Sequence, residues 1–346
     1  MTATKSLALL VGTVALLASK QPEPGSTRPI DFLRNRVGLD DRQLQAVEDG
    51  EAVAIVLDTS LDREVAVFGV VWVAAPIERY LSLYEDIEEF EASASLQIRK
   101  VSQPPELVDF ADMTFPEEDL EDLRDCKVGD CEIKLGQESL EHLRLDVDWS
   151  SGDAIDELNA FLRERAFGYA VEYRNGGNQA LAVYRDKERP TFVTKEFQGL
   201  LENTPLLPLY LPALHRYLLE YPNVELPGAE DFFYWAKNDF GLKPIVRLSH
   251  VTIYRPPDRD GQAVIASKQL YSSHYFHTAL ELRFLIEDAE RPGGFYFMNL
   301  NRSRSDGLEG FKGLFTRGKV KSGARDGIQK VLEHTKRTLE EKDQED

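Results

Sequence analysis

The last third of the chain limits the possible folds most, because strand-like and turn-like segments alternate there before a final amphipathic helix. Segments rich in β-branched and aromatic residues predict five strands, at 231–237, 244–254, 262–271, 276–287 and 294–301. Gly241, the segment 258–261 and the triplet 292–294 supply turn residues between them. Such short connections favour antiparallel neighbours, so we expect a meander.

Alternation along residues 278–286 divides this strand into two faces. One face carries Leu280, Leu282, Phe284 and Ile286, and the other carries Ala279, Glu281, Arg283 and Leu285. Two interpretations of Glu281 and Arg283 stay open: a solvated face, or a charged pair inside a cavity that orients the polar head of a ligand. Burying such a pair is costly unless both partners are satisfied.

The end of the chain predicts a helix whose apolar stripe packs on the sheet. Its members recur at helical spacing: Ile328, Val331, Leu332, Thr335 and Leu339. Just before it, residues 307–323 carry five glycines and interleave apolar with basic side chains, which predicts a mobile basic loop. Such a loop either gates a cavity or contacts an anionic membrane surface, or it is a connector packed on the sheet.

The first two thirds predict further strands and a helix-rich insertion. Residues 64–73 are apolar on both faces, so layers are expected on both sides of that strand. A helix is expected from 76 to about 89, followed by a strand near 95–101. Within an insertion from about 112 to 221, the pattern predicts helices at 117–125, 155–173 and 213–220 and a strand at 179–184.

Charge excludes one broad class of function. With 41 Lys and Arg against 60 Asp and Glu, the chain has a formal net charge of −19. A protein this acidic is not expected to bind nucleic acid through a general positive field. Charge is also uneven, because residues 85–125 hold 14 acidic and 3 basic residues, whereas 302–337 hold 10 basic and 4 acidic ones.

The N-terminus predicts export. Lys5 precedes the apolar run Ser6–Leu17, which is too short for a membrane span but typical of a secretory signal. We therefore expect a signal peptide at 1–19 and a periplasmic or secreted protein; a buried apolar helix is the alternative. The remaining divisions are a flexible linker at 20–38, a single domain at 39–341 and a tail at 342–346.

The two cysteines, Cys126 and Cys131, lie five positions apart with Gly129 and Asp130 between them. An exported protein permits a disulfide that closes this turn. Two unpaired thiols are the alternative. A metal or redox site is a third interpretation, but a metal site needs more ligands, and His142 is the one candidate nearby with regular spacing.

The order of elements resembles the helix-grip fold of the START-type lipid-transfer and polyketide-cyclase superfamily. The segments that carry the resemblance are EVAVFGVVWVAAPIERYLSLYEDIEEF, QAVIASKQLYSSHYFHTALELRFL, GFYFMNLNRSRSDGLEGF and the terminal helix. The resemblance implies an α+β fold in which a curved antiparallel sheet wraps around a long C-terminal helix and encloses an apolar cavity. Here that fold would also contain the helical insertion. The superfamily has no universal catalytic set, so the resemblance assigns no catalytic residue.

We therefore expect a binding or carrier protein for a lipid or other apolar small molecule. Candidate ligand-binding residues are the aromatic and polar side chains expected around the cavity: Trp72, Trp235, Tyr271, His274, Arg283, Phe284, Phe297 and Asn299. Phosphate-cradling loops and the motifs HExxH and GxSxG are absent, and we predict no catalytic residue, metal or cofactor.

Two other functions remain in competition. One is a cyclase- or hydrolase-like enzyme with His274 or His250 as acid or base, assisted by Tyr271 or Glu281. His277 lies three positions after His274, so on one regular strand the two rings would point to opposite faces. The other is an interaction module of the cell envelope, whose association would weaken as salt rises.

Overall fold

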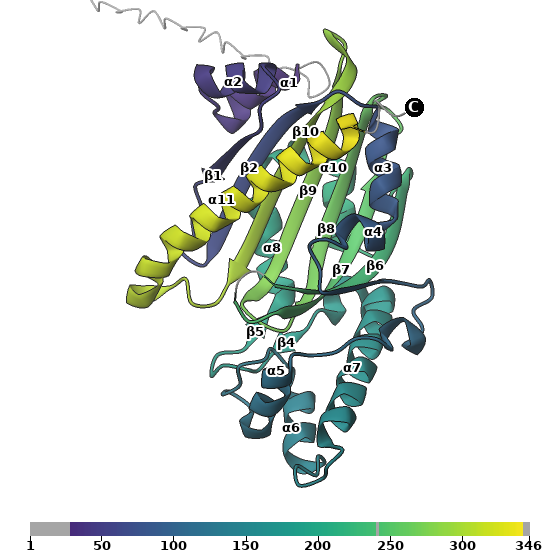
Figure 1. Ribbon diagram of the computed structural model, residues 1–346, viewed down its shortest axis with the longest axis vertical. Coiled ribbons are helices and arrows are strands. Elements are labelled where there is room, and N and C mark those ends of the chain that lie inside the picture. Colours follow the sequence, from purple (N-terminus) through teal and green to yellow (C-terminus); the bar gives the residue numbers. More distant parts are fainter. Residues whose placement is uncertain (1–27, 240–241, 342–346) are drawn as a thin grey trace, which may run out of the picture.

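A large antiparallel sheet organises the molecule in the computed structural model, which describes residues 28–239 and 242–341. The predicted signal peptide, residues 20–27, Gly241 and the tail 342–346 lie outside the described residues. Within the described residues, the main sheet has eight strands in the order β1-β2-β10-β9-β8-β7-β6-β3 (Figure 1). These strands are β1 Val53–Leu57, β2 Glu64–Val73, β3 Gln97–Val101, β6 Ala229–Asn238, β7 Ile245–Tyr254, β8 Gln262–Ser272, β9 Phe276–Asp288 and β10 Arg291–Ser305.

The predicted meander is confirmed, because β6 to β10 pair in sequence order and each pair is antiparallel. The sheet is extended by a long-range pairing, in which β2 lies antiparallel to β10 with Val67 opposite Asn301. All ten residues of β2 are buried, as expected for a strand that is covered on both faces.

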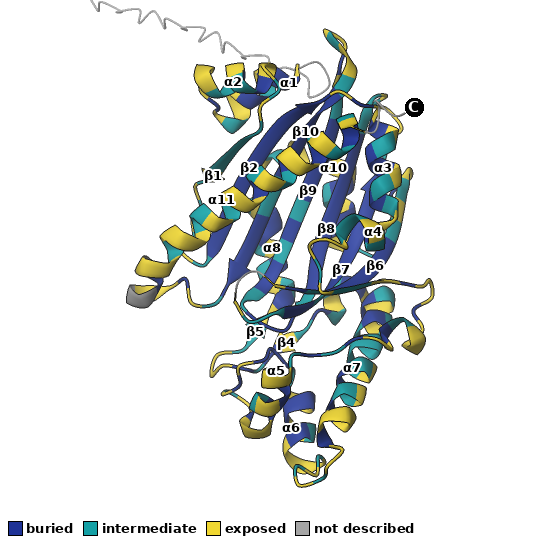
Figure 2. Ribbon diagram, viewed as in Figure 1, coloured by how far each residue is buried: buried dark blue, intermediate teal, exposed yellow. Residues whose placement is uncertain are grey.

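One face of the sheet packs against α11 (Gly310–Glu341), α3 (Ile77–Glu85) and α4 (Ile87–Glu91). The helix α11 lies along β1 and β2, with its buried side toward the sheet and an exposed outer side (Figure 2). Gly69 allows this close approach, because a Cβ there would lie 2.5 Å from Cγ2 of Ile328 and 2.7 Å from Cδ1 of Leu332. The chain is therefore an α+β protein with a large antiparallel sheet and a long C-terminal helix.

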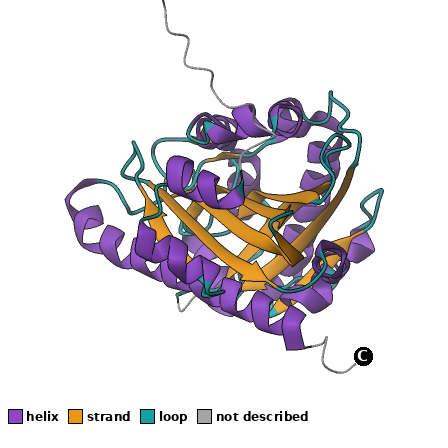
Figure 3. Ribbon diagram, turned by 90° about the horizontal axis from the view of Figure 1, so that it is seen from above, coloured by secondary structure: helices purple, strands orange, loops and turns teal. Residues whose placement is uncertain are grey.

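The opposite face packs against the N-terminal helices and the insertion, so helices lie on both sides of the sheet (Figure 3). The N-terminal elements are α1 Pro29–Phe32, the π-helix η1 Leu33–Val37 and α2 Asp41–Glu48. The insertion between β3 and β6 contains η2 Leu107–Phe110, α5 Glu117–Asp122, η3 Leu123–Asp125, α6 Gln137–Leu145, α7 Ala154–Gly176, η4 Gly177–Ala180, β4 Val183–Tyr184, β5 Thr191–Phe192, α8 Val193–Glu202, α9 Leu206–Tyr210 and α10 Pro212–Glu220.

The prediction of a mobile loop at 307–323 is wrong from Gly310 onward, where α11 begins. Gly313 suits the first turns, because a Cβ there would lie 2.2 Å from the carbonyl oxygen of Leu308. A Cβ at Gly318 or Gly323 would meet nothing within 4 Å, so these glycines lie on the open side of the helix. Glycine costs about 1 kcal/mol relative to alanine at such positions but does not end a helix.

The predicted linker at 20–38 is also wrong in its described part. Pro29 opens α1 at a position that tolerates proline, and the buried Leu33 anchors the following π-helix. Gly38 ends it with φ +85°, the left-handed conformation that glycine adopts readily.

Two smaller expectations also differ. The helix expected from 76 to 89 breaks at Asp86, whose side chain accepts a hydrogen bond from the backbone N–H of Glu89 and begins α4. The strand expected at 179–184 is reduced to the two residues of β4, because Asn178 donates to the carbonyls of Leu218 and Leu219 and keeps the preceding turn against α10. Across the described ranges, no helix is both long and apolar enough to cross a membrane.

Candidate functional site

An apolar cavity of about 370 Å³ lies on the sheet face opposite α11. We call it the Phe284 pocket. Its floor consists of strand side chains from four neighbouring strands, Phe68, Val264, Leu282, Phe284, Ile286, Met298 and Leu300. The volume is near the lower end of the range of about 300–1,000 Å³ found for small-molecule sites in proteins.

Phe284 occupies the centre of this floor because of the register of the sheet. Val264 on β8 and Met298 on β10 are both directly opposite Phe284 on β9. In the next row along the strands, Leu282 lies opposite Leu300, which in turn lies opposite Phe68 on β2. The alternation seen in the sequence thus places one apolar row beside another on the same face.

Two short helices cover this floor. Phe32 of α1 and Tyr210 of α9 meet edge to face with ring centroids 5.2 Å apart, and both line the pocket. Pro205 and Pro212 flank α9, and Leu211 between α9 and α10 has φ −134° and ψ 60°, outside the helical region. The prolines therefore prevent one long helix and leave α9 as a five-residue cover.

The charged side chains that line the pocket all have the same sign. They are Arg36, Arg259 and Arg302, and no Asp or Glu belongs to the described lining. Arg36 is exposed and Arg259 is half-buried, whereas Arg302 is buried. This excess of positive charge contrasts with the formal net charge of −19 for the whole chain.

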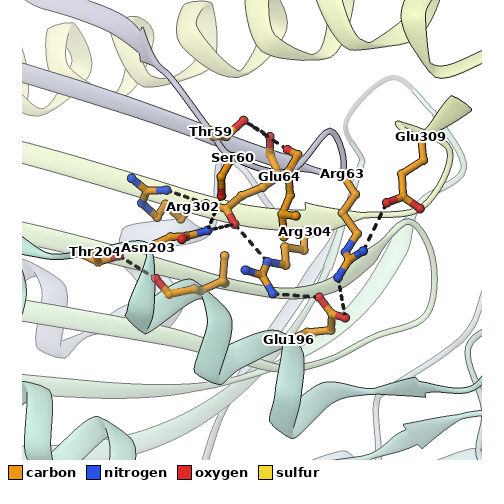
Figure 4. Close-up of polar contacts among 12 residues, drawn as sticks. Thr59, Ser60, Arg63, Glu64, Glu196, Asn203, Thr204, Arg302, Arg304 and Glu309 are labelled. Atoms are coloured by element: carbon orange, nitrogen blue, oxygen red, sulfur yellow. Dashed lines mark hydrogen bonds and ion pairs between the residues drawn. The ribbon is translucent and has the colours of Figure 1, made fainter.

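Arg302 belongs to a cluster of ion pairs at one end of the pocket (Figure 4). Its Nη1 lies 2.5 Å from Oε1 of Glu64, and the other carboxylate oxygen of Glu64 lies 3.0 Å from Nε of Arg304. Asn203, directly after α8, donates from Nδ2 to Oε2 of Glu64 at 2.8 Å. Glu64 is fully buried, so these three donors replace the water that the carboxylate loses.

The cluster continues toward the surface through α8. Arg304 Nη1 lies 3.1 Å from Oε2 of Glu196, and Arg63 Nη2 lies 3.2 Å from Oε1 of the same carboxylate. Arg63 also pairs with Glu309, whose side chain is 60% exposed. Three arginines therefore face two carboxylates in the less exposed part of the cluster, and Nε of Arg302 is buried without a hydrogen-bond partner.

The structure separates the predicted binding residues instead of bringing them around one cavity. Of the predicted binding residues, only Phe284 lines the Phe284 pocket. Tyr271 lines a second cavity of about 340 Å³, between α6, α7 and the ends of β7 and β8, and its buried hydroxyl has no hydrogen-bond partner. Trp72 packs edge to face against Tyr296, 5.0 Å between ring centroids, on the same sheet face as the Phe284 pocket but outside its lining.

Arg283, Phe297 and Asn299 lie on the other face of the sheet, toward α3. Arg283 donates from Nε to Oε1 of Glu281 at 3.0 Å and from Nη1 to the hydroxyl of Tyr80 at 2.9 Å. Asn299 donates to the same Glu281 oxygen at 2.7 Å, and Phe297 packs 4.9 Å from the Tyr80 ring. The interpretation of a solvated face is therefore wrong for this pair, whose polar atoms are largely satisfied within the protein.

Burial raises the pKa of the Glu281 carboxyl, but the charge and hydrogen bonds of Arg283 outweigh it, so the pKa lies below its usual value. The ion pair thus stays charged at neutral pH although it is buried.

Trp235 and His274 hold the insertion to the sheet. Trp235 Nε1 donates to the carbonyl of Asp109 at 2.8 Å. His274 lies in the turn between β8 and β9, with Nε2 2.8 Å from Oδ2 of the buried Asp119. His277 is also buried and pairs with the half-buried Asp306, so both histidines serve ion pairs within the protein, and no histidine belongs to the described lining of either cavity.

A buried polar chain that the sequence reasoning missed crosses the middle of the sheet. Lys268 Nζ lies 3.2 Å from the hydroxyl of Tyr173, which lies 3.0 Å from Nδ1 of His250, whose Nε2 lies 3.0 Å from Oδ1 of Asp231. Burial lowers the pKa of Lys268 well below its usual value. Burial also lowers the pKa of His250, and Asp231 only partly opposes that change. The sequence did contain a signal for this chain: Lys268 lies on the same face of β8 as the apolar Val264 and Ala266, so the strand pattern places a lysine on a buried face.

Cys126 and Cys131 are joined in a disulfide, and Gly129 in the turn between them has φ +90°. Among the described residues, no group of three or more His, Cys, Asp or Glu side chains is arranged to hold a metal ion.

Comparison with known proteins adds no family to this description: no protein-family model matches the chain, and no curated protein matches it significantly.

Proposed function

We propose that this protein binds or carries a lipid or other apolar small molecule in the Phe284 pocket. The observation that carries the proposal is a cavity of about 370 Å³ whose floor consists of apolar side chains. A ligand that buries apolar surface there gains roughly 25 cal/mol for each Å² removed from water. This gain needs no reactive side chains, in keeping with the lining.

The strand order supports the proposal that this fold is of the helix-grip kind. The sheet order β2-β10-β9-β8-β7-β6-β3, with two helices after β2 and one long helix after β10, agrees with a curved sheet that grips its terminal helix. In that superfamily the cavity lies between the sheet and the helix. Here that face is filled by Ile328, Leu332 and the Arg283 pair, so our proposal places the ligand on the opposite face.

A matched pair of substitutions in α9 tests the proposal. Leu206 lines the pocket, whereas Leu209 on the same short helix is 42% exposed and lies outside the lining. We expect Leu206→Trp to fill the cavity and weaken binding of an environment-sensitive apolar probe such as N-phenyl-1-naphthylamine, while Leu209→Trp binds as the unmodified protein does. Native mass spectrometry of the purified protein should show a co-purified ligand that Leu206→Trp lacks. Equal probe binding by both variants would contradict the proposal.

We also propose that the protein is exported. The disulfide between Cys126 and Cys131 supports this proposal, because disulfides persist in oxidising compartments. Fractionation of the native host tests it: recovery of the protein only with the reducing cytosol, and with free thiols, would contradict export.

A further inference from the structure

We propose that the ligand of the Phe284 pocket is a monoanionic amphiphile with a single tail, such as a fatty acid, whose carboxylate lies against Arg302. This inference rests on the proposed function and adds the chemistry of the head group. It is carried by the charge of the lining and by the surroundings of Arg302.

The lining selects the sign of the ligand. Arg36, Arg259 and Arg302 line the pocket, and none of the described lining residues is acidic. In a chain with 19 more acidic than basic residues, an acid-free wall with three arginines disfavours a cationic head and favours an anionic one.

The ion cluster shows where the head group would bind. Glu64 is shared between Arg302 and Arg304, and Glu196 is shared between Arg304 and Arg63. Glu309, the remaining carboxylate, is 60% exposed and is therefore screened by water. Counted with Glu309, three carboxylates balance the three guanidinium groups, and Arg302 is the arginine of the cluster that lines the pocket, so a head group with one negative charge would bind at its guanidinium.

Arg63 and Arg302 both have a buried Nε without a hydrogen-bond partner, and of these two only Arg302 lines the pocket. Its Nη1 serves Glu64, but its Nε is buried and has no acceptor. A buried donor without an acceptor is uncommon in folded proteins. A carboxylate at the Arg302 end of the pocket would supply that acceptor in a charge-assisted hydrogen bond.

The apolar floor continues from Arg302 in one direction only. Leu300 and Met298 follow Arg302 on the same face of β10, and Phe284 lies opposite Met298. At roughly 3.3 Å per strand residue, the distance from Arg302 to Met298 is about 13 Å, enough for an extended acyl tail to lie along. Arg36 and Arg259 are more exposed than Arg302, so they attract an anion toward the pocket but form weaker contacts with it.

Three ligands with the same tail and different heads test the proposal: dodecanoate, dodecanol and dodecylammonium. Each competes at neutral pH with N-phenyl-1-naphthylamine on the full protein, after bound lipid has been removed. We expect dodecanoate to bind about tenfold more tightly than dodecanol, because it alone adds a charge-assisted hydrogen bond. Dodecylammonium should bind most weakly.

Substitutions in the cluster identify the residue responsible. Arg302→Gln should remove the preference for dodecanoate over dodecanol, because it lowers the affinity for dodecanoate by about tenfold more than that for dodecanol. Arg63→Gln is the matched control, because Arg63 belongs to the same cluster but does not line the pocket. If Arg302→Gln does not fold, the double variant Glu64→Gln/Arg302→Gln removes both members of the pair, and the same loss of preference is expected.

The outcomes separate this inference from the proposed function. If all three ligands bind with equal affinity and Leu206→Trp weakens them all, the head-group assignment is wrong and the apolar site stands. If no ligand and no probe binds, the proposed function and this inference both fail. A preference for dodecanoate that survives in both variants at Arg302 would overturn the role of that residue.

Discussion

The carboxylate of Glu64, which is fully buried at the start of β2, lies 2.5 Å from the guanidinium of Arg302 on β10, although 238 residues separate them in the sequence. The two strands are neighbours in the sheet, and Arg304, directly opposite Glu64, contacts its second oxygen. One carboxylate therefore contacts two arginines on the last strand of the sheet, and Glu196 pairs with the second of them.

Glu64→Gln should strongly destabilise the protein, because it leaves Arg302 and Arg304 buried with only Glu196 to compensate them. Removing one partner of a buried ion pair typically costs about 3–5 kcal/mol. The free energy of unfolding from urea titration measures this change. Glu309→Gln is the control: this side chain is 60% exposed, so the loss should stay below about 1 kcal/mol. Similar losses for the two variants would contradict the importance of burial.

Replacing Lys268 should change how stability depends on pH. Burial lowers the pKa of Lys268 in the folded protein, so between that pKa and about 10.4 the unfolded chain binds the proton more tightly. The stability of the unmodified protein therefore falls as pH falls through this range, and the penalty is constant at pH values below the folded pKa. Lys268→Met removes the penalty, so its stability relative to the unmodified protein should rise as pH is lowered from 10 to 7.

Melting temperatures measured across this pH range test the prediction about Lys268. The exposed Lys195 provides the control, and Lys195→Met should give a difference from the unmodified protein that does not vary with pH. A difference for Lys268→Met that is equally flat would show that this amine titrates as an ordinary lysine does.

Gly69→Ala should loosen the contact between α11 and the sheet. The added Cβ would lie 2.5 Å from Ile328 and 2.7 Å from Leu332, so the helix must shift, at a cost of about 1–3 kcal/mol. Gly318→Ala in α11 is the opposite case, since a Cβ there meets nothing within 4 Å, and it should stabilise the helix by up to about 1 kcal/mol. Urea unfolding should show a lower free energy of unfolding for Gly69→Ala and a higher one for Gly318→Ala. Destabilisation by both substitutions would contradict this account of the interface.

Much of the sheet could be predicted from the sequence because the information is local. Period-two patterns placed β6 to β10 and separated the face of Phe284 from that of Arg283, and turn residues set the meander. The helix α11 was predicted only in its second half, because glycines at open helix positions look the same in a sequence as glycines in a loop.

The candidate site was predicted less well because it depends on contacts between distant segments. The Phe284 pocket exists only where α1 and α9 lie over β9, and no local pattern reports that contact. The resemblance to helix-grip proteins pointed to the other face, where Arg283 pairs with Glu281. Arg302 was missed for the same reason, since its role follows from its pairing with Glu64 across strands from opposite ends of the chain.

Because β2 lies between β1 and β10 in the sheet, one of its edges cannot pair until β10 has been synthesised. The strand β10 is synthesised after the other strands of the sheet, so this edge of β2 stays unpaired during most of translation. Pairing between segments so far apart in the sequence is also slow to form. An unpaired strand that carries no charged residue from Val65 to Val73 readily joins strands of other chains. A nascent chain that ends before Arg291 therefore exposes an aggregation-prone strand edge. We expect efficient folding in the cell to depend on a chaperone that covers β2 until β10 has been synthesised.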